Sequence, residues 1–140
     1  MINIPFTLDD GAYPPERAYT ADAGFDLRSR EMMIIPPRGS AVINTGVHMA
    51  IPEGYVGFLK SKSGLNVNHD VTGTGVIDSG YTGPIQVKLY NHHNLHSYKI
   101  NVGDKVSQIV ILPIPEVNFY PVEELSKTER GGAGFGSTGR

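Results

Sequence analysis

Asp78 and Tyr81 stand close together in the segment G-V-I-D-S-G-Y, which covers residues 75–81. A carboxylate between glycines at the end of a strand can approach a ligand closely and take a proton from a water molecule. The same local sequence also suits a turn aspartate that bonds its own backbone, and a tyrosine here can simply pack in a core. Taken alone, the segment favours the turn over the catalytic site.

Three further segments carry polar groups. Residues 60–65 read K-S-K-S-G-L, and their ammonium, hydroxyl and backbone amide groups suit phosphate oxygens, although a surface turn has the same composition. Residues 103–108 read G-D-K-V-S-Q and join a turn to a polar side chain. Residues 23–27 read A-G-F-D-L and place Asp26 between apolar neighbours, where a carboxylate is either structural or in contact with the water shell of a metal ion.

Residues 130–139 read R-G-G-A-G-F-G-S-T-G. Glycine loses more conformational entropy on ordering than any other residue, so we expect this segment to be flexible until a ligand orders it. It is not a phosphate loop, because Ser137 stands where that loop needs a lysine. A solvated terminus explains the glycines but leaves Phe135 without a purpose.

The histidines invite a metal hypothesis, chiefly His92, His93 and His96 in N-H-H-N-L-H. The chain has no cysteine, and their spacing is not that of a tetrahedral zinc site. We therefore expect an exposed connection between strands rather than a metal site.

The length of 140 residues predicts one domain, and a net charge of −2 argues against a nucleic-acid or membrane surface. The absence of cysteine excludes disulfides and a thiolate nucleophile. The amino-terminal residues lack the basic flank and apolar run of a signal peptide or membrane helix. We expect a cytoplasmic protein, or one inside the host cell if the gene is viral.

The elements that must position these residues are predicted to be short strands, because 17 glycines and 10 prolines interrupt the chain. Residues 83–90 alternate, with Ile85, Val87 and Leu89 on one face. An all-β sandwich or jelly roll follows, with a core of residues 1–121 and an arm of residues 122–140. Further strands are expected at residues 32–35, 41–43, 55–59, 109–114 and 117–120, and a helical turn or two at residues 106–109 or 122–127.

Taken in order, the segments A-G-F-D-L, K-S-G-L, G-V-I-D-S-G-Y-T-G, G-D-K-V-S-Q and R-G-G-A-G-F-G-S-T-G resemble the five motifs of trimeric deoxyuridine triphosphate nucleotidohydrolases, the dUTPase family. The resemblance implies a distorted jelly-roll (β-clip-like) subunit and a homotrimer whose active sites are shared between subunits. It also implies Mg²⁺ bound mainly through substrate phosphates and water, without direct protein ligands. Such enzymes convert dUTP and water to dUMP and pyrophosphate by attack on the α-phosphorus, which limits uracil incorporation into DNA.

The resemblance also implies roles for individual residues. Asp78 resembles the base that deprotonates the attacking water, and Tyr81 the platform beneath the deoxyribose. Asp26 resembles the first-motif aspartate, which acts behind the phosphate-contacting residues or through a metal-bound water. The other implied substrate contacts are backbone groups of Gly75, Val76 and Ile77 on uracil; Lys62, Ser63, Gly64 and Gln108 on phosphates; and an arm in which Arg130 meets the γ-phosphate, Phe135 stacks on uracil, and Gly136, Ser137 and Thr138 approach phosphate oxygens.

Three positions depart from the family pattern. Lys62 replaces the usual arginine, which exchanges a planar two-pronged donor for a flexible point charge. Gly80 replaces a common aspartate, and Pro84 replaces a polar residue. Two alternatives stay open: a nucleotide-dependent interaction or regulatory protein on the same fold, and a relative of dCTP deaminase, in which the complete segment 130–139 is not expected.

Overall fold

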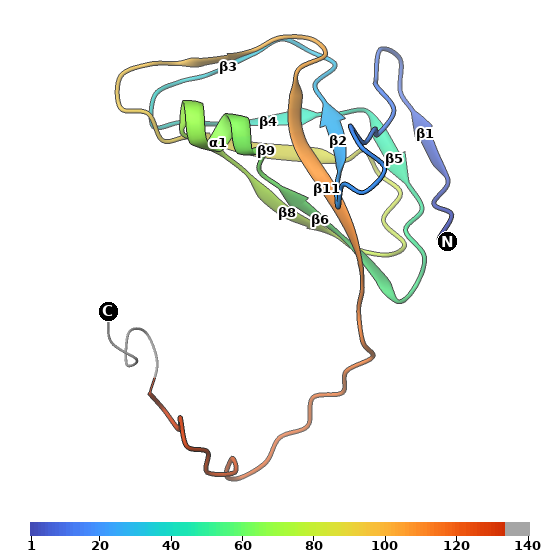
Figure 1. The fold of residues 1–140 in the computed structure, drawn as a ribbon, viewed down its shortest axis with the longest axis vertical. Coiled ribbons are helices and arrows are strands. Elements are labelled where there is room, and N and C mark those ends of the chain that lie inside the picture. Colours follow the sequence, from blue (N-terminus) through green and yellow to red (C-terminus); the bar gives the residue numbers. More distant parts are fainter. Residues whose placement is uncertain (134–140) are drawn as a thin grey trace.

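The computed structural model describes residues 1–133, and it consists of a β-rich body from which the C-terminal segment extends (Figure 1). The described residues form eleven strands and one helix. In chain order these are β1 (Phe6–Leu8), β2 (Phe25–Arg28), β3 (Met33–Ile35), β4 (Ser40–Asn44), β5 (Val47–Met49), β6 (Tyr55–Lys60), α1 (Ser63–His69), β7 (Val71–Thr72), β8 (Thr74–Ile77), β9 (Gln86–Asn91), β10 (Tyr98–Ile100) and β11 (Lys105–Pro113).

The strands form small antiparallel sheets, which confirms the predicted all-β fold class. A four-stranded sheet has the order β2-β11-β6-β8, and a three-stranded sheet has the order β4-β9-β7. Two strand pairs, β1 with β5 and β3 with β10, complete the body. The long strand β11 therefore lies between β2 and β6, and β8 lies at an edge of its sheet.

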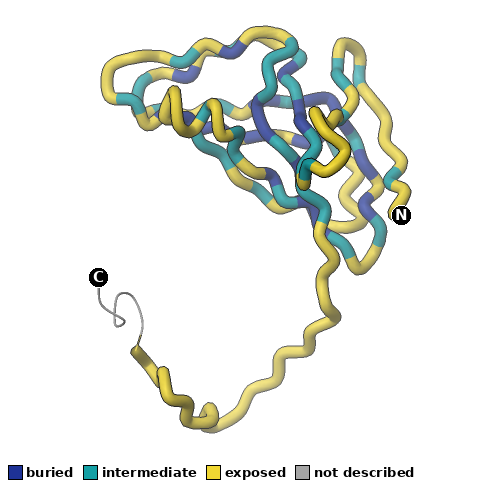
Figure 2. Tube along the Cα trace, in the orientation of Figure 1, coloured by how far each residue is buried: buried dark blue, intermediate teal, exposed yellow. Residues whose placement is uncertain are grey.

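The core lies between these sheets, as the dark blue stretches of Figure 2 show. Strand β9 illustrates its origin: Val87 and Leu89 are buried, whereas Gln86 and Lys88 are exposed. This alternation has the period of two that a half-buried strand requires, and it confirms the strand predicted there. Burial of each such aliphatic side chain contributes about 1.5–3 kcal/mol.

Some local predictions were wrong. The only helix among residues 1–133, α1, was not among the predicted elements. It begins in a segment whose sequence suits either phosphate contacts or a surface turn, and it ends at His69, before the left-handed backbone of Asp70 (φ 55°) turns the chain. Residues 106–109 are not helical but belong to β11, because Val106 and Ile109 are β-branched and face the core between two partner strands. Residues 117–120 form no strand and 122–127 no helical turn, since neither segment packs against the body.

The C-terminal segment leaves the body after β11. The N–H of Ile114 still donates to the Gly54 carbonyl oxygen at 2.8 Å, but residues 114–133 are exposed and contain no strand or helix (Figure 2). The division of the chain at residues 121 and 122 stays a prediction. Among the described residues, no helix has the length and apolarity that crossing a membrane requires.

Candidate active site

Asp78 follows the last residue of the edge strand β8 and is exposed. Its side chain makes no hydrogen bond or ion pair to any other residue within 1–133. A tight turn follows, in which the N–H of Tyr81 donates to the Asp78 carbonyl at 3.3 Å and Gly80 adopts the left-handed φ of 81°. The turn leaves the Asp78 carboxylate free to accept a proton from a bound water.

The side chain of Tyr81 is held beside this carboxylate-bearing turn. Its hydroxyl donates to the Pro84 carbonyl at 3.0 Å, and its side chain lies so close to Gly83 that a Cβ there would stand 2.5 Å from the tyrosine oxygen. Tyr81 is 44% exposed, so one part of the ring is fixed and another can meet a ligand. A side chain at position 83 would therefore displace the tyrosine ring from this position.

Strand β8 offers backbone groups rather than side chains. Ile77 is buried in the core, Val76 is exposed, and a Cβ on Gly75 would lie 3.2 Å from Leu59. One edge of β8 pairs with β6, while the other edge has no hydrogen-bonded strand within the described part of the chain. The N–H and C=O groups on that edge can therefore pair with a ligand.

Asp26 forms a charged cluster with two lysines at the opposite end of this sheet. The Lys62 ammonium lies 2.5 Å from one Asp26 carboxylate oxygen, and the Lys105 ammonium lies 2.6 Å from the other. Burial acts to raise the pKa of Asp26, but the hydrogen bonds and positive charges of Lys105 and Lys62 outweigh it, so the pKa lies below its ordinary value of 3.8. Two ammonium groups around one carboxylate leave an excess of one positive charge.

Gln108 lies beside this cluster, on β11 between Asp26 of β2 and Lys60 of β6. Its amide donates to the Ser61 carbonyl at 3.2 Å, and its oxygen would be 2.8 Å from a Cβ on Gly24. Because Gly24 has no side chain, the side chain of Gln108 can lie directly against its backbone.

Ser63 and Gly64 begin α1 directly after Lys62, and both are exposed. The three neighbouring residues predicted to contact phosphate therefore lie at the start of this helix, and the Lys62 side chain among them donates to Asp26.

The structure divides the predicted site into two groups within one chain. Asp26, Gln108, Lys60 and Thr74 stand in one row across the four-stranded sheet. Asp78 lies four residues beyond Thr74, a displacement of about 13 Å along an extended strand. The turn that carries Asp78 and the charged cluster around Asp26 therefore lie at different ends of the sheet within one chain.

Arg130 lies in the exposed C-terminal segment, where its Nε donates to the Ala133 carbonyl oxygen at 3.1 Å. Phe135, Gly136, Ser137 and Thr138 lie outside the described residues.

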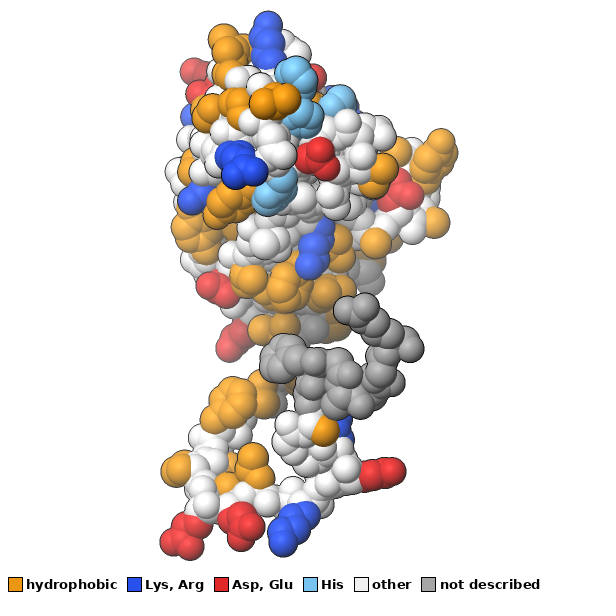
Figure 3. Space-filling view, turned by 90° about the vertical axis from the view of Figure 1, so that its left-hand side faces the viewer, with side chains coloured by type: hydrophobic (Ala, Val, Ile, Leu, Met, Phe, Trp, Pro, Cys, Tyr) orange, Lys and Arg blue, Asp and Glu red, His pale blue; other side chains and the backbone are white. Residues whose placement is uncertain are grey.

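The histidines at residues 92–96 bond neighbouring backbone groups and one hydroxyl on β7. His93 Nδ1 accepts the N–H groups of Leu95 and His96, and His92 lies 2.7 Å from the Thr72 hydroxyl. Histidine side chains gather near the end of the body opposite the C-terminal segment (Figure 3). Within residues 1–133, no group of three or more histidine and carboxylate side chains could hold a metal ion.

Lys105 is the residue of the charged cluster that sequence reasoning missed. It lies in the segment G-D-K-V-S-Q, but its partner Asp26 is on another strand. The sequence shows a lysine three residues before Gln108, but it does not show that this lysine meets Asp26. That contact follows only from the register of β2 and β11.

Over nearly its whole length the chain is similar to one family of known proteins. The dUTPase family model matches residues 11–139. A protein of Tropheryma whipplei (strain Twist), described as deoxyuridine 5'-triphosphate nucleotidohydrolase, is 42% identical over 136 residues, covering 95% of this chain and 93% of the relative. A protein of Cutibacterium acnes with the same description is 43% identical over 128 residues, covering 89% and 84%.

Solved structures give the same result. The Staphylococcus bacteriophage 80alpha dUTPase with dUPNHPP superimposes with a TM-score of 0.93 at 35% identity, covering 100% of both chains. A mutant dUTPase from phage phi11 of S. aureus, described as revealing the coordination of a structural Mg(II) ion, has a TM-score of 0.82 at 33% identity, covering 88% of this chain and 98% of that one. These matches place the protein among the hydrolases of nucleotide metabolism. Within that class, the chain belongs to the dUTPase family.

Proposed function

We propose that this dUTPase-family protein hydrolyses dUTP to dUMP and pyrophosphate, with Asp78 as the general base for attack of water on the α-phosphorus. The observation that carries this assignment is the carboxylate of Asp78, which is exposed and unpaired among the described residues, beside the fixed ring of Tyr81. A carboxylate with free oxygens can orient a water and accept its proton.

The edge of β8 supports uracil as the base. Gly75, Val76 and Ile77 present backbone donors and acceptors on an edge that no described strand covers. A base whose hydrogen-bond pattern does not match leaves polar groups unpaired, at a cost of about 1–3 kcal/mol for each group. Tyr81 would lie beneath the deoxyribose and leave no room for a ribose 2′-hydroxyl.

The charged cluster supports a triphosphate. A triphosphate repels a nucleophile through its own charge, so the protein must supply positive charge and align the water with the leaving pyrophosphate. Lys62 and Lys105 share one carboxylate, and Gln108, Ser63 and Gly64 lie next to them. Asp26 then acts by holding Lys62 in place, behind the groups that touch phosphate.

The residues present also suit Mg²⁺ held by the substrate. Within the described chain no cluster of side chains could form a metal cage, and both oxygens of Asp26 are taken by lysines. An ion bound mainly through phosphate oxygens and water fits this donor set. When bound, it would supply positive charge that neutralises the phosphates.

A homotrimer with shared sites would bring the two groups of site residues together. Asp78 and the charged cluster lie at different ends of one sheet, so the phosphate contacts of one subunit can complete the base-reading turn of another. An apolar groove lined by Ile2, Ile4, Phe6, Phe25 and Ile111 is open on the isolated chain, and it supports burial of this surface in an assembly.

Pyrophosphate release from dUTP, with dCTP, dTTP and UTP as competing substrates, tests this function. We expect dUTP to be clearly preferred and Asp78→Asn to lower kcat by about 10²–10⁴-fold, because the amide cannot take the proton. Asp70→Asn is the matched control: it makes the same chemical change at an exposed left-handed position that asparagine tolerates, and full activity is expected. Tight dUTP binding without turnover would favour a regulatory protein instead, and full activity of Asp78→Asn would contradict the assigned base.

A further inference from the structure

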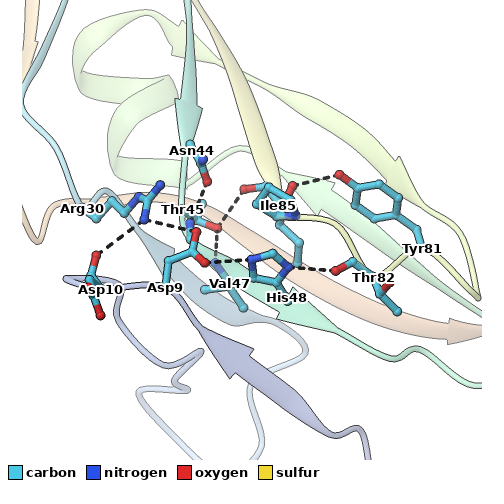
Figure 4. A network of polar contacts seen from close by, with 12 residues as sticks. Asp9, Asp10, Arg30, Asn44, Thr45, Val47, His48, Tyr81, Thr82 and Ile85 are labelled. Atoms are coloured by element: carbon cyan, nitrogen blue, oxygen red, sulfur yellow. Dashed lines mark hydrogen bonds and ion pairs between the residues drawn. The ribbon is translucent and has the colours of Figure 1, made fainter.

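His48, in the short strand β5, joins two segments that are distant in the sequence. Its Nδ1 lies 2.8 Å from the carbonyl oxygen of Thr82, and its Nε2 lies 3.1 Å from a carboxylate oxygen of Asp9 (Figure 4). Asp9 follows β1, and Thr82 follows Tyr81 in the turn that carries the proposed base. The histidine ring therefore lies directly between the N-terminal segment and the active-site turn.

Both partners of the ring are acceptors. A carbonyl oxygen carries no proton, and the Asp9 carboxylate accepts from the ring with one oxygen while its second oxygen pairs with Arg30 at 3.2 Å. Two hydrogen bonds to two acceptors require a proton on each ring nitrogen, so the bridging form of His48 is the imidazolium. The hydrogen bond to the Thr82 carbonyl raises the pKa of His48 above its ordinary value, desolvation opposes it, and Asp9 adds to the rise while Arg30 reduces it.

The turn has few other attachments. Residues 78–84 bond among themselves through Asp78 with Tyr81 and through Tyr81 with Pro84. At Ile85 the chain rejoins the body, where the N–H of Ile85 donates to Val47 at 2.8 Å. Among the hydrogen bonds of the described residues, the bond from His48 is the only one that ties residues 78–84 to another part of the chain.

We propose that His48 is a positioning residue of the active site: by bonding the Thr82 carbonyl it holds the turn in the conformation that presents Asp78 and Tyr81 to the substrate. The inference rests on the proposed function of this turn. His48 touches neither substrate nor reacting atoms in this role.

The charged groups that face His48 define how the tether depends on pH. Asp9 comes from the segment after β1, Arg30 from the segment after β2, and the active-site turn contributes only a neutral carbonyl. As the pH rises through the pKa of His48 in the folded protein, the ring loses a proton and can donate only one hydrogen bond. The Asp9 carboxylate and the Thr82 carbonyl then compete for the one remaining N–H, so the turn is tethered for less of the time. The apparent affinity for substrate falls in proportion to the fraction of protein in the competent conformation.

His48→Phe tests the tether because it keeps a ring of similar shape and removes both nitrogens. We expect KM for dUTP to rise about fivefold at a pH near 6, with kcat changed by less than about twofold, because one modest hydrogen bond sets the competent fraction. The wild type should show KM rising as the pH increases above 6.5, the ordinary pKa of histidine, and His48→Phe should lack this rise. His96→Ala, a histidine outside this network, is the matched control and should keep the wild-type profile.

Asp9→Asn provides a second variant that keeps an acceptor for the ring but removes its charge. Because Asp9 raises the pKa of His48, the rise in KM should begin at a lower pH in this variant. NMR titration of the His48 ring, recorded on the same proteins without substrate, should show the same order of midpoints.

Wild-type kinetics in His48→Phe, or a KM profile that the substitution does not change, would overturn the proposal. A fall in thermal stability with unchanged kinetics would also overturn it and leave His48 a structural residue. If His48→Phe does not fold, the midpoint shift in Asp9→Asn decides. Failure of the proposed function can be distinguished from failure of this proposal, because the wild-type protein would then not hydrolyse dUTP at any pH.

Discussion

Asp26 shows how one residue can organise cations in a chain whose net charge is negative. Its buried carboxylate holds Lys62 and Lys105, which lie on different elements, and the group keeps one uncompensated positive charge. Lysine is a point charge on a flexible stem, and the ion pair with Asp26 fixes where the Lys62 ammonium lies. The second lysine keeps the cluster positive after the first is neutralised.

Asp26→Asn should therefore lower the free energy of unfolding by about 1–3 kcal/mol at neutral pH, less than for a fully buried pair, because both lysines are partly exposed. The folded pKa of Asp26 is depressed, so its contribution is present above the unfolded pKa and is lost as the pH falls through the folded pKa. Chemical denaturation at about pH 7 and about pH 3 measures both effects. A variant as stable as wild type at neutral pH would contradict this account, and Asp70→Asn again serves as control.

The elements differ in how far the sequence predicts them. Strand β9 follows from the alternation of Val87 and Leu89, and the five glycine-containing motifs locate the predicted site. Helix α1 could not be anticipated from its own residues, because Lys62 is not a capping side chain and Gly64 is a weak helix former. Two contacts of the site join residues that are distant in the sequence: Asp26 and Lys62 are 36 residues apart, and His48 and Thr82 are 34 residues apart. Such contacts follow only from the way the strands pair.

Gly73, the single residue between β7 and β8, lies so close to β9 that there is no room for a side chain. A Cβ there would stand 2.6 Å from the Lys88 backbone oxygen and 2.7 Å from a methyl group of Leu89, both on β9. Because the backbone of a central strand cannot easily move away, Gly73→Ala should destabilise the fold by about 1–3 kcal/mol. Thermal or urea unfolding measures the change.

Gly64→Ala is the matched control for this substitution. Its Cβ would meet nothing within 4 Å, and alanine favours the helix, so we expect equal or slightly greater stability. Equal stability of Gly73→Ala and Gly64→Ala would show that β9 adapts to the added methyl group.

At the scale of the whole molecule, the C-terminal segment separates from the body while carrying large apolar side chains. Phe119 is 92% exposed and Leu125 is 81% exposed. Exposure of such large apolar side chains to water is unfavourable for an isolated subunit. Together with the division of the site between two ends of the sheet, they agree with the proposal that subunits complete one another.

Deletion of residues 130–140 should lower kcat/KM for dUTP by about a hundredfold or more, because the arm's cation and aromatic group would no longer order the bound nucleotide. The assembly should stay intact, as a solution mass measurement can verify. A variant with these residues replaced by an equally long Gly-Ser segment should be just as inactive, since the proposed effect lies in the side chains. Loss of the assembly would instead make the arm a structural element.

The edge of β8 that no described strand covers has an evolutionary consequence. If peptide groups read the nucleobase, the base takes the place of a neighbouring strand, and the groups that recognise it are common to every amino acid. Side chains such as the exposed Val76 can then vary with little effect on the choice of base. Specificity would be lost through changes in backbone path, as at Gly73 or Gly83, rather than through changes in the reading residues, which makes base selection robust to mutational drift.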